Sequence, residues 1–180
     1  MRLFIALPVT ADALRALEDA QAALRRNGVR GRFTPPENHH LTLAFLGNVE
    51  DPAPVIGAME RVPVPKTALR FDRLTLFGDV LVALLKQNDA LEQYARALRA
   101  ALDEAGIRYD RQTFRPHITL CRKTALPSPD FRLFPSERPL RGVRLPVKEA
   151  KLMASDLSGG TPEYSAVYTQ KAQLNRQKRR

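Results

Sequence analysis

Apolar and polar positions near the start of the chain predict a strand, a helix and a second strand. The apolar run over residues 2–7 is typical of a short strand and stops at Pro8. Apolar side chains then recur at helical spacing over residues 11–27, and Gly28 follows as a C-terminal stop. Residues 40–46 alternate between polar and apolar side chains, which predicts a strand with one buried face.

The remainder of the chain continues as short elements of both kinds. In order, it predicts a short helix from Asp51 to about Arg61, a hairpin over residues 68–77 and 80–86, a helix from Asn88 or Asp89 to Gly106, a strand over residues 117–121, a proline-rich loop over residues 125–139, and strands near residues 143–154 and 163–168. The sequence therefore predicts a chain of mixed strands and helices.

The two halves repeat one pattern. Each has an apolar strand, a leucine-rich helix, a Gly-[Val/Ile]-Arg stop and a strand that begins His-x-Thr-Leu. The offset from Gly28 to Gly106 is almost the same as the offset from His40 to His117. Four matches in one order predict an internal duplication with two lobes related by a pseudo-two-fold axis. The alternative is two unrelated β-α-β stretches of similar composition.

The repeated strands carry the candidate chemistry. Side chains two apart in a strand share a face, so His40 and Thr42 lie together, as do His117 and Thr119. In two lobes that face one another, these polar faces would line one cleft. One imidazole can accept a proton while the other donates one near neutral pH, and threonine hydroxyls can donate to phosphate oxygens.

The distribution of charge along the sequence indicates a class of binding partner. The formal net charge is +10, of which residues 1–90 contribute +1 and residues 91–180 contribute +9. Residues 171–180 are predicted to be a basic flexible tail after a single domain over residues 1–170. This charge favours a polyanionic partner, RNA or a nucleotide. The alternative is a generally basic, solvated surface.

Composition also bears on compartment. The single Cys121 excludes an internal disulfide framework and a multi-cysteine zinc site, and suits a reducing compartment. We find neither an apolar run of membrane-spanning length nor a leader with a cleavage site. We therefore expect a cytoplasmic, unprocessed protein that does not bind membranes.

His40-Leu-Thr-Leu43 and His117-Ile-Thr-Leu120 resemble the paired H-x-T-x motifs of the two-histidine (2H) phosphoesterases. The residues around them narrow the resemblance to the RNA 2′,3′-cyclic phosphodiesterase branch, also called LigT-like. These are Arg2-Leu-Phe-Ile-Ala-Leu-Pro8, Pro35-Pro-Glu-Asn38, Phe45-Leu-Gly47 and Phe114-Arg-Pro116. The resemblance covers about residues 1–170. This sequence departs from its relatives at two positions: they often have an apolar residue in place of His39 and a tryptophan in place of Phe33.

This resemblance implies a bilobal α+β fold with two antiparallel sheets around a central cleft and no required metal or organic cofactor. It implies hydrolysis of RNA 2′,3′-cyclic phosphate ends to 2′-phosphates, and in some members the joining or cleavage of 2′–5′ linkages. By analogy, His40 is the proton donor and His117 the proton acceptor, while Thr42 and Thr119 bind phosphate oxygens. From the residues alone, the two histidines are interchangeable. We expect a monomer.

Four further residues are candidates for substrate binding. Arg115 would share the face of His117 in a regular strand, whereas Arg122 would face away unless the strand twists or ends. Arg122 also matches an arginine common after the second motif in relatives. Phe4 and Phe45 could stack a base, although both also fit a plain core. His39 should point away from the cleft, in a surface or structural role.

Other functions fit the residues less well. A zinc site lacks H-E-x-x-H and flanking carboxylates, and a serine hydrolase lacks G-x-S-x-G. Nucleotide-binding glycine loops are also absent from the sequence. The alternatives that stay open are a basic RNA-binding module without catalysis and a 2H phosphodiesterase for a different cyclic nucleotide.

Overall fold

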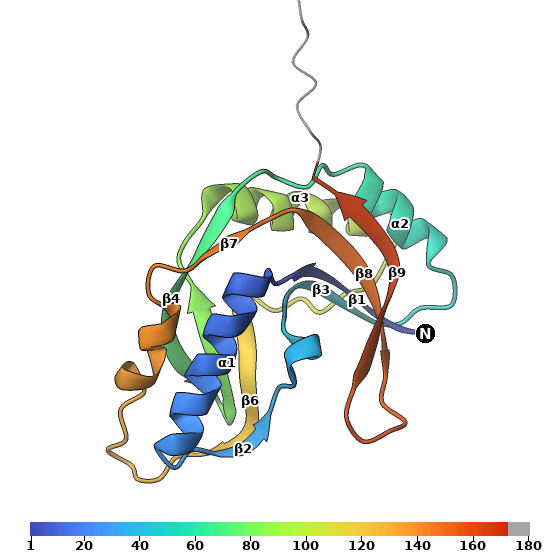
Figure 1. Ribbon diagram of the computed structural model, residues 1–180. Helices are drawn as coiled ribbons and strands as arrows, with labels where there is room; N and C mark the ends of the chain where they lie inside the picture. Colours follow the sequence, from blue (N-terminus) through green and yellow to red (C-terminus); the bar gives the residue numbers. More distant parts are fainter. Residues whose placement is uncertain (173–180) are drawn as a thin grey trace, which may run out of the picture.

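The computed structural model describes residues 1–172 of the chain (Figure 1). Its strands are β1 (Arg2–Pro8), β2 (Arg30–Phe33), β3 (His40–Asn48), β4 (Ala68–Phe77), β5 (Val80–Leu85), β6 (His117–Ala125), β7 (Arg144–Pro146), β8 (Glu149–Asp156) and β9 (Glu163–Lys171). Its helices are α1 (Ala11–Arg26), α2 (Ala53–Glu60) and α3 (Asp89–Glu104), with short 3-10 helices η1 (Pro36–Asn38) and η2 (Phe134–Leu140). The fold class is therefore α+β, as the family resemblance implies.

The strands form two antiparallel arms that meet at the middle. The sheet order is β7-β4-β5-β6-β3-β1-β8-β9, and β2 pairs with β6 at the side. One arm is β7-β4-β5-β6 and the other is β3-β1-β8-β9. A single residue pair, Leu41 with Ile118, joins the arms through β3 and β6. This narrow junction lets the arms splay apart while the two motif strands stay side by side.

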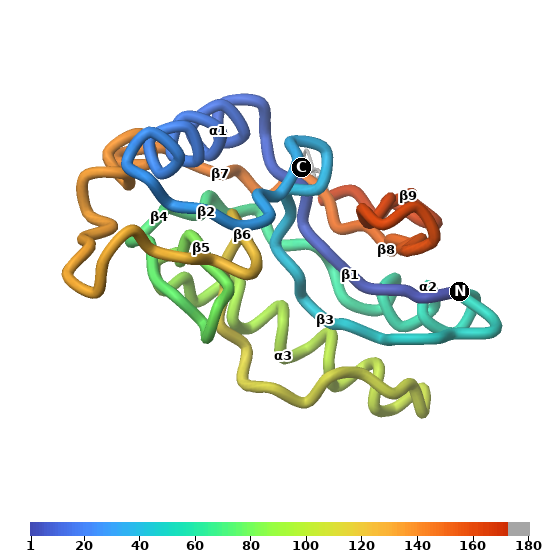
Figure 2. The backbone as a smooth tube through the Cα atoms, turned by 90° about the horizontal axis from the view of Figure 1, so that it is seen from below, coloured from blue at the N-terminus to red at the C-terminus, as the bar shows by residue number. Residues whose placement is uncertain are grey.

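Each long helix crosses from the strand that precedes it to the opposite arm. Helix α1 follows β1 but contacts η2 and β7, whereas α3 follows β5 but contacts α2 and β3 (Figure 2). Both helices end at a glycine with positive φ, Gly28 at 88° and Gly106 at 69°, as the sequence predicts. Their apolar faces pack onto the sheet and close one continuous core.

Side-chain hydrogen bonds from α1 and α3 are related by the predicted pseudo-two-fold symmetry. The buried Gln21 side chain of α1 donates to the carbonyls of Thr34 and Leu120 at 2.9 Å each. Its counterpart in the second half, Arg99 of α3, donates to the carbonyls of Gln112 and Leu43 at 2.9 and 3.5 Å. Corresponding positions of the two halves thus make corresponding contacts, which favours duplication over a coincidence of composition.

Several sequence predictions need correction. Residues 30–33 form β2, which the pattern does not predict, and the predicted loop over residues 125–139 contains most of η2. The strand predicted near residues 143–154 is two strands, because β7 pairs with β4 while β8 pairs with β1 on the other arm. Lys171 belongs to β9 and its ammonium pairs with Glu149, so it is not tail. Ala172 is also held, because its N–H donates to the Lys148 carbonyl at 2.8 Å, and the remaining residues of the predicted tail, 173–180, lie outside the described residues.

No helix within residues 1–172 is long and apolar enough to cross a membrane.

Candidate active site

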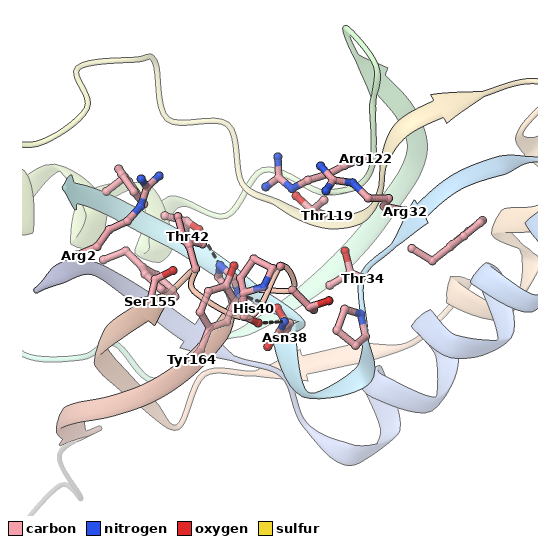
Figure 3. Close-up of a pocket in the computed structure, with 18 of the residues that line it drawn as sticks. Arg2, Arg32, Thr34, Asn38, His40, Thr42, Thr119, Arg122, Ser155 and Tyr164 are labelled. Atoms are coloured by element: carbon pink, nitrogen blue, oxygen red, sulfur yellow. Dashed lines mark hydrogen bonds between the residues drawn. The ribbon is translucent and has the colours of Figure 1, made fainter. Parts of the chain in front are cut away.

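A cleft of about 790 Å³ lies at the junction of the two arms. Both motif strands contribute to it, together with β1, β2, η1, β8, β9 and the segment that joins β8 to β9 (Figure 3). Its lining residues are Arg2, Phe4, Arg32, Phe33, Thr34, Pro35, Asn38, His40, Thr42, Phe45, His117, Thr119, Arg122, Ser155, Leu157, Gly160, Thr161, Pro162 and Tyr164. The structure thus brings His40, Thr42, His117 and Thr119 to one cavity.

Matching β-bulges place two further candidates in the cleft. Along β6, successive residues of β5 pair with Cys121 and then Thr119, so the strand carries one extra residue. Along β3, successive residues of β1 pair with Ala44 and then Thr42. An extra residue reverses the alternation beyond it. Arg122 and Phe45, each five positions after its histidine, therefore lie on the histidine face rather than opposite it.

The backbone fixes both imidazoles in the same orientation. His40 Nδ1 donates to the Asn38 carbonyl at 2.7 Å, and His117 Nδ1 donates to the Arg115 carbonyl at 2.6 Å. A carbonyl can only accept, so in the neutral ring Nδ1 carries the proton and Nε2 is the basic atom. His40 Nε2 also lies 3.1 Å from Thr42 Oγ1. In each ring, Nε2 is therefore the atom that can accept or donate a proton in catalysis.

Burial and nearby cations lower the pKa of both imidazoles. For His40, burial is the largest cause, and the Arg122 guanidinium and His117 lower the pKa further against the hydrogen bond to Asn38. For His117, burial again dominates, and Arg115 and Arg122 add to it against its own backbone bond. Both rings are therefore mainly neutral at pH 7 in the free protein. A bound anion would oppose the cations and make protonation easier.

Arginines give the cleft a positive field. Arg2, Arg32 and Arg122 line it, and the lining residues include no Asp or Glu. Arg115 is not among them: its guanidinium stacks over the Phe77 ring at 4.1 Å. The structure therefore gathers Arg122 at the site and leaves the side chain of Arg115 outside, although the Arg115 carbonyl holds His117. The bulk of Phe77 beside His117 accounts for this placement, because stacking satisfies the guanidinium there.

Aromatic rings support His40. The Phe4 ring lies 4.9 Å from the His40 ring, and Tyr164 lies 5.4 Å from it, with Phe4 and Tyr164 5.0 Å apart. Phe4 is 3% exposed, so it packs against the imidazole and offers little surface to a ligand. Phe45 lies beneath the Arg2 guanidinium at 4.8 Å and is partly exposed.

Several lining residues have no sequence signal near the motifs. Tyr164 comes from β9, far along the chain from the second motif, and Arg32 comes from the unpredicted β2. Asn38 links two parts of the site, because its side chain donates to the Pro162 carbonyl at 2.7 Å while its own carbonyl holds His40. The proline before the motif predicts a turn there but not this contact.

His39 lies apart from the cleft and inside the protein. It is 4% exposed, does not line the cavity, and neither ring nitrogen has a hydrogen-bond partner among the described residues. Burial, with a smaller effect from His40, lowers the pKa of His39 from 6.5 to about 4. Of the two roles expected for it, the surface role is wrong and the structural one fits.

Two neutral imidazoles from twin strands, facing one arginine-rich cleft, define a site of the phosphoesterase class. The family described as "LigT like Phosphoesterase" matches the chain twice, over residues 7–84 and 82–164. The chain therefore belongs to the LigT-like phosphoesterase family, and the two matches correspond to the two halves of the duplication.

Relatives agree with this assignment. A Geobacillus stearothermophilus protein named RNA 2′,3′-cyclic phosphodiesterase is 32% identical over 133 residues, a match that covers 67% of this chain and 41% of that protein. A crystal structure from Thermus thermophilus is similar with a TM-score of 0.76 and 28% identity, covering 96% of this chain and 98% of that one. Escherichia coli LigT complexed with 3′-AMP is similar with a TM-score of 0.70 and 26% identity over the same shares.

Proposed function

We propose that the protein hydrolyses 2′,3′-cyclic phosphate ends of RNA to 2′-phosphates, without a metal, through His40 and His117. The observation that carries this proposal is the pair of Nδ1-anchored imidazoles lining one cleft with Arg2, Arg32 and Arg122. The named activity of the Geobacillus relative and the 3′-AMP complex of LigT support the substrate class.

The reaction divides between the two histidines. Neutral His117 takes a proton from water through Nε2 as the water oxygen bonds to phosphorus. The bond from phosphorus to O3′ breaks, and protonated His40 gives its Nε2 proton to O3′, which leaves a 3′-hydroxyl and a 2′-phosphomonoester. Arg122 and the hydroxyls of Thr42 and Thr119 stabilise the charge that develops on the phosphate oxygens.

An asymmetry between the two rings supports this assignment. The Thr42 hydroxyl is an acceptor for a proton on His40 Nε2, so the charged ring has a partner before the leaving oxygen arrives. His117 Nε2 has no partner within residues 1–172, which leaves it open to a water molecule. Both halves of the cleft come from one chain, so we expect the monomer to be active.

The test is an end-group assay. Purified protein in excess EDTA is incubated with an RNA oligonucleotide that ends in a 2′,3′-cyclic phosphate, and the terminal nucleotide is compared with 2′- and 3′-phosphate standards. We expect a 2′-phosphate, and a loss of about 100-fold or more in kcat for His40→Ala and for His117→Ala. The matched control is His39→Leu, which removes the remaining histidine outside the cleft and should retain activity.

Each other outcome has a distinct meaning. A 3′-phosphate product would keep the two-histidine chemistry and reverse the leaving oxygen. Inhibition by EDTA would contradict metal independence. RNA binding that is equal in wild type and both alanine variants, with no turnover of any cyclic nucleotide, would favour a binding module without catalysis.

A further inference from the structure

One surface beside the cleft carries positive charge with no carboxylate to balance it. We call it the α1–β2 surface: it comprises Arg25, Arg26, Arg30, Arg32, Arg122 and Lys123. All six are exposed, and neither residues 20–36 nor residues 111–129 contain an acidic residue. Within the described part of the chain, none of the six forms an ion pair with a carboxylate. Their charge is therefore available to an anionic ligand.

This surface is continuous with the cleft. Arg32 and Arg122 are direct partners across β2 and β6, and both line the cavity (Figure 3). Like charges opposite one another on neighbouring strands destabilise a sheet, so the pair suits a site where an anion lies between them. Arg25 stacks over the ring of Phe33, which also lines the cleft, at 4.1 Å. The positive charge thus runs from the cavity onto the end of α1.

The duplicated counterpart of this surface has the opposite character. When Gly28 is aligned with Gly106, residues 25–34, with four arginines and no acid, correspond to residues 103–112, with three acids and two arginines. Arg25, Arg26 and Arg32 correspond to Asp103, Glu104 and Asp110. Asp103 also neutralises Arg111 in an ion pair. Two surfaces that correspond in the duplication therefore differ in charge, and of the two only the α1–β2 surface contributes lining residues to the cleft.

A single-stranded RNA fits this surface better than a small anion does. Six cations on a strand, a helix end and the neighbouring strand exceed what one phosphate requires, whereas an RNA chain brings one phosphate per nucleotide. Among the described strands, β2 pairs with β6 alone, so its second edge has no strand partner. An arginine stacked on an aromatic ring is also a common platform for an unpaired base.

We propose that the RNA chain leading to the cyclic phosphate leaves the cleft across the α1–β2 surface and not across the surface of residues 103–112. This rests on the proposed function, because it takes the terminal phosphate to lie between the two histidines. The part of the surface outside the cleft, Arg25, Arg26, Arg30 and Lys123, then contributes affinity for oligonucleotides and nothing for a mononucleotide, whose only phosphate lies in the cleft.

The test compares matched double variants of the full chain. Arg26→Gln with Arg30→Gln removes two charges from the α1–β2 surface without touching a lining residue. Arg96→Gln with Arg108→Gln removes two exposed charges from α3 and the segment after it, on the opposite side, and Arg108 is the counterpart of Arg30. For each, kcat/KM is measured with 2′,3′-cyclic AMP and with a ten-nucleotide RNA carrying the same end, over a series of salt concentrations.

We expect the first double variant to lose about 5- to 10-fold in kcat/KM on the RNA at low salt, with a salt slope smaller by about 1.4 and an unchanged rate on cyclic AMP. The second should match wild type on both substrates. Equal losses in the two variants, or none in either, would overturn the proposed path. RNA binding, measured by fluorescence anisotropy, tests the surface independently of catalysis. If the wild-type protein turns over neither substrate, the proposed function is refuted, and the anisotropy of the two double variants still decides between the two surfaces.

Discussion

Replacing His39 with leucine should stabilise the protein, and most strongly in acid. The imidazole is 4% exposed and lacks polar partners within residues 1–172, so folding removes two polar atoms from water without replacing their hydrogen bonds. Leucine is close in volume and makes no such demand. We expect a gain of about 1 kcal/mol at pH 7, after a packing cost is subtracted from a desolvation penalty of about 1–3 kcal/mol.

The pH dependence supplies a sharper magnitude. Burial lowers the pKa of His39 from 6.5 to about 4, so the unfolded chain binds the proton first as the pH falls. The stability that neutral His39 permits is full above about pH 6.5 and is lost as the pH falls toward 4. The difference between these two pKa values lowers the free energy of unfolding by about 2 kcal/mol between pH 7 and pH 5. The leucine variant has no group that titrates at this position and should not show this loss.

The assay is urea unfolding of both proteins at pH 7 and pH 5. The other titrating groups are common to the two chains, so the difference between the chains isolates His39. We expect the gap in unfolding free energy to widen by about 2 kcal/mol at pH 5. If both proteins lose stability in parallel, the His39 nitrogens are hydrogen-bonded to something and the reasoning fails.

Three further outcomes follow from the site. Because the pKa values of both cleft histidines are lowered, the maximum of kcat/KM against pH should lie below pH 6.5. Arg122→Gln removes a cation that lowers both pKa values, so it should move this maximum to higher pH and slow the reaction. A maximum at the same pH in the variant would contradict the role of Arg122. Gln21→Leu removes the side-chain donor of the Thr34 carbonyl and one of the two donors of the Leu120 carbonyl, which still accepts from the Thr34 N–H at 2.8 Å. It should cost about 1 kcal/mol in urea unfolding, and a cost below about 0.3 kcal/mol would show that the bonds are dispensable. Asn38→Ala removes the hydrogen bond to the Pro162 carbonyl, so it should raise KM several-fold and lower the free energy of unfolding by about 1 kcal/mol. An unchanged KM would show that this contact does not contribute to substrate binding.

Local pattern predicts much of this fold because its main elements bury one face each. Strands β1, β3 and β6 and helices α1 and α3 have clean periodicity and glycine stops, and the spacing of His40 and His117 reveals the duplication. The elements missed are those that tertiary contact stabilises. Strand β2 is only Arg30–Phe33, and it exists because Gly31, at a φ of 147°, lets the backbone approach Cys121; a side chain at this position would meet the Cys121 sulfur at 2.6 Å.

The cleft is harder to predict than the motifs that line it. The alternation rule places His40 and Thr42 together, but it would send Phe45 and Arg122 to the wrong face, because a β-bulge leaves no mark in a single sequence. Tyr164 reaches the site only through the pairing of β9 with β8, which depends on tertiary structure and is not a local property.

The central claim is that His40 and His117 act on opposite sides of one phosphate as acid and base. The most direct measurement uses an RNA cyclic phosphate in which sulfur replaces the 3′ bridging oxygen, since a thiolate leaves without needing a proton. On this substrate we expect His40→Ala to recover most of the wild-type rate, while His117→Ala remains about 100-fold or more slower. Equal impairment of both variants on the oxygen and sulfur substrates would contradict the division of roles.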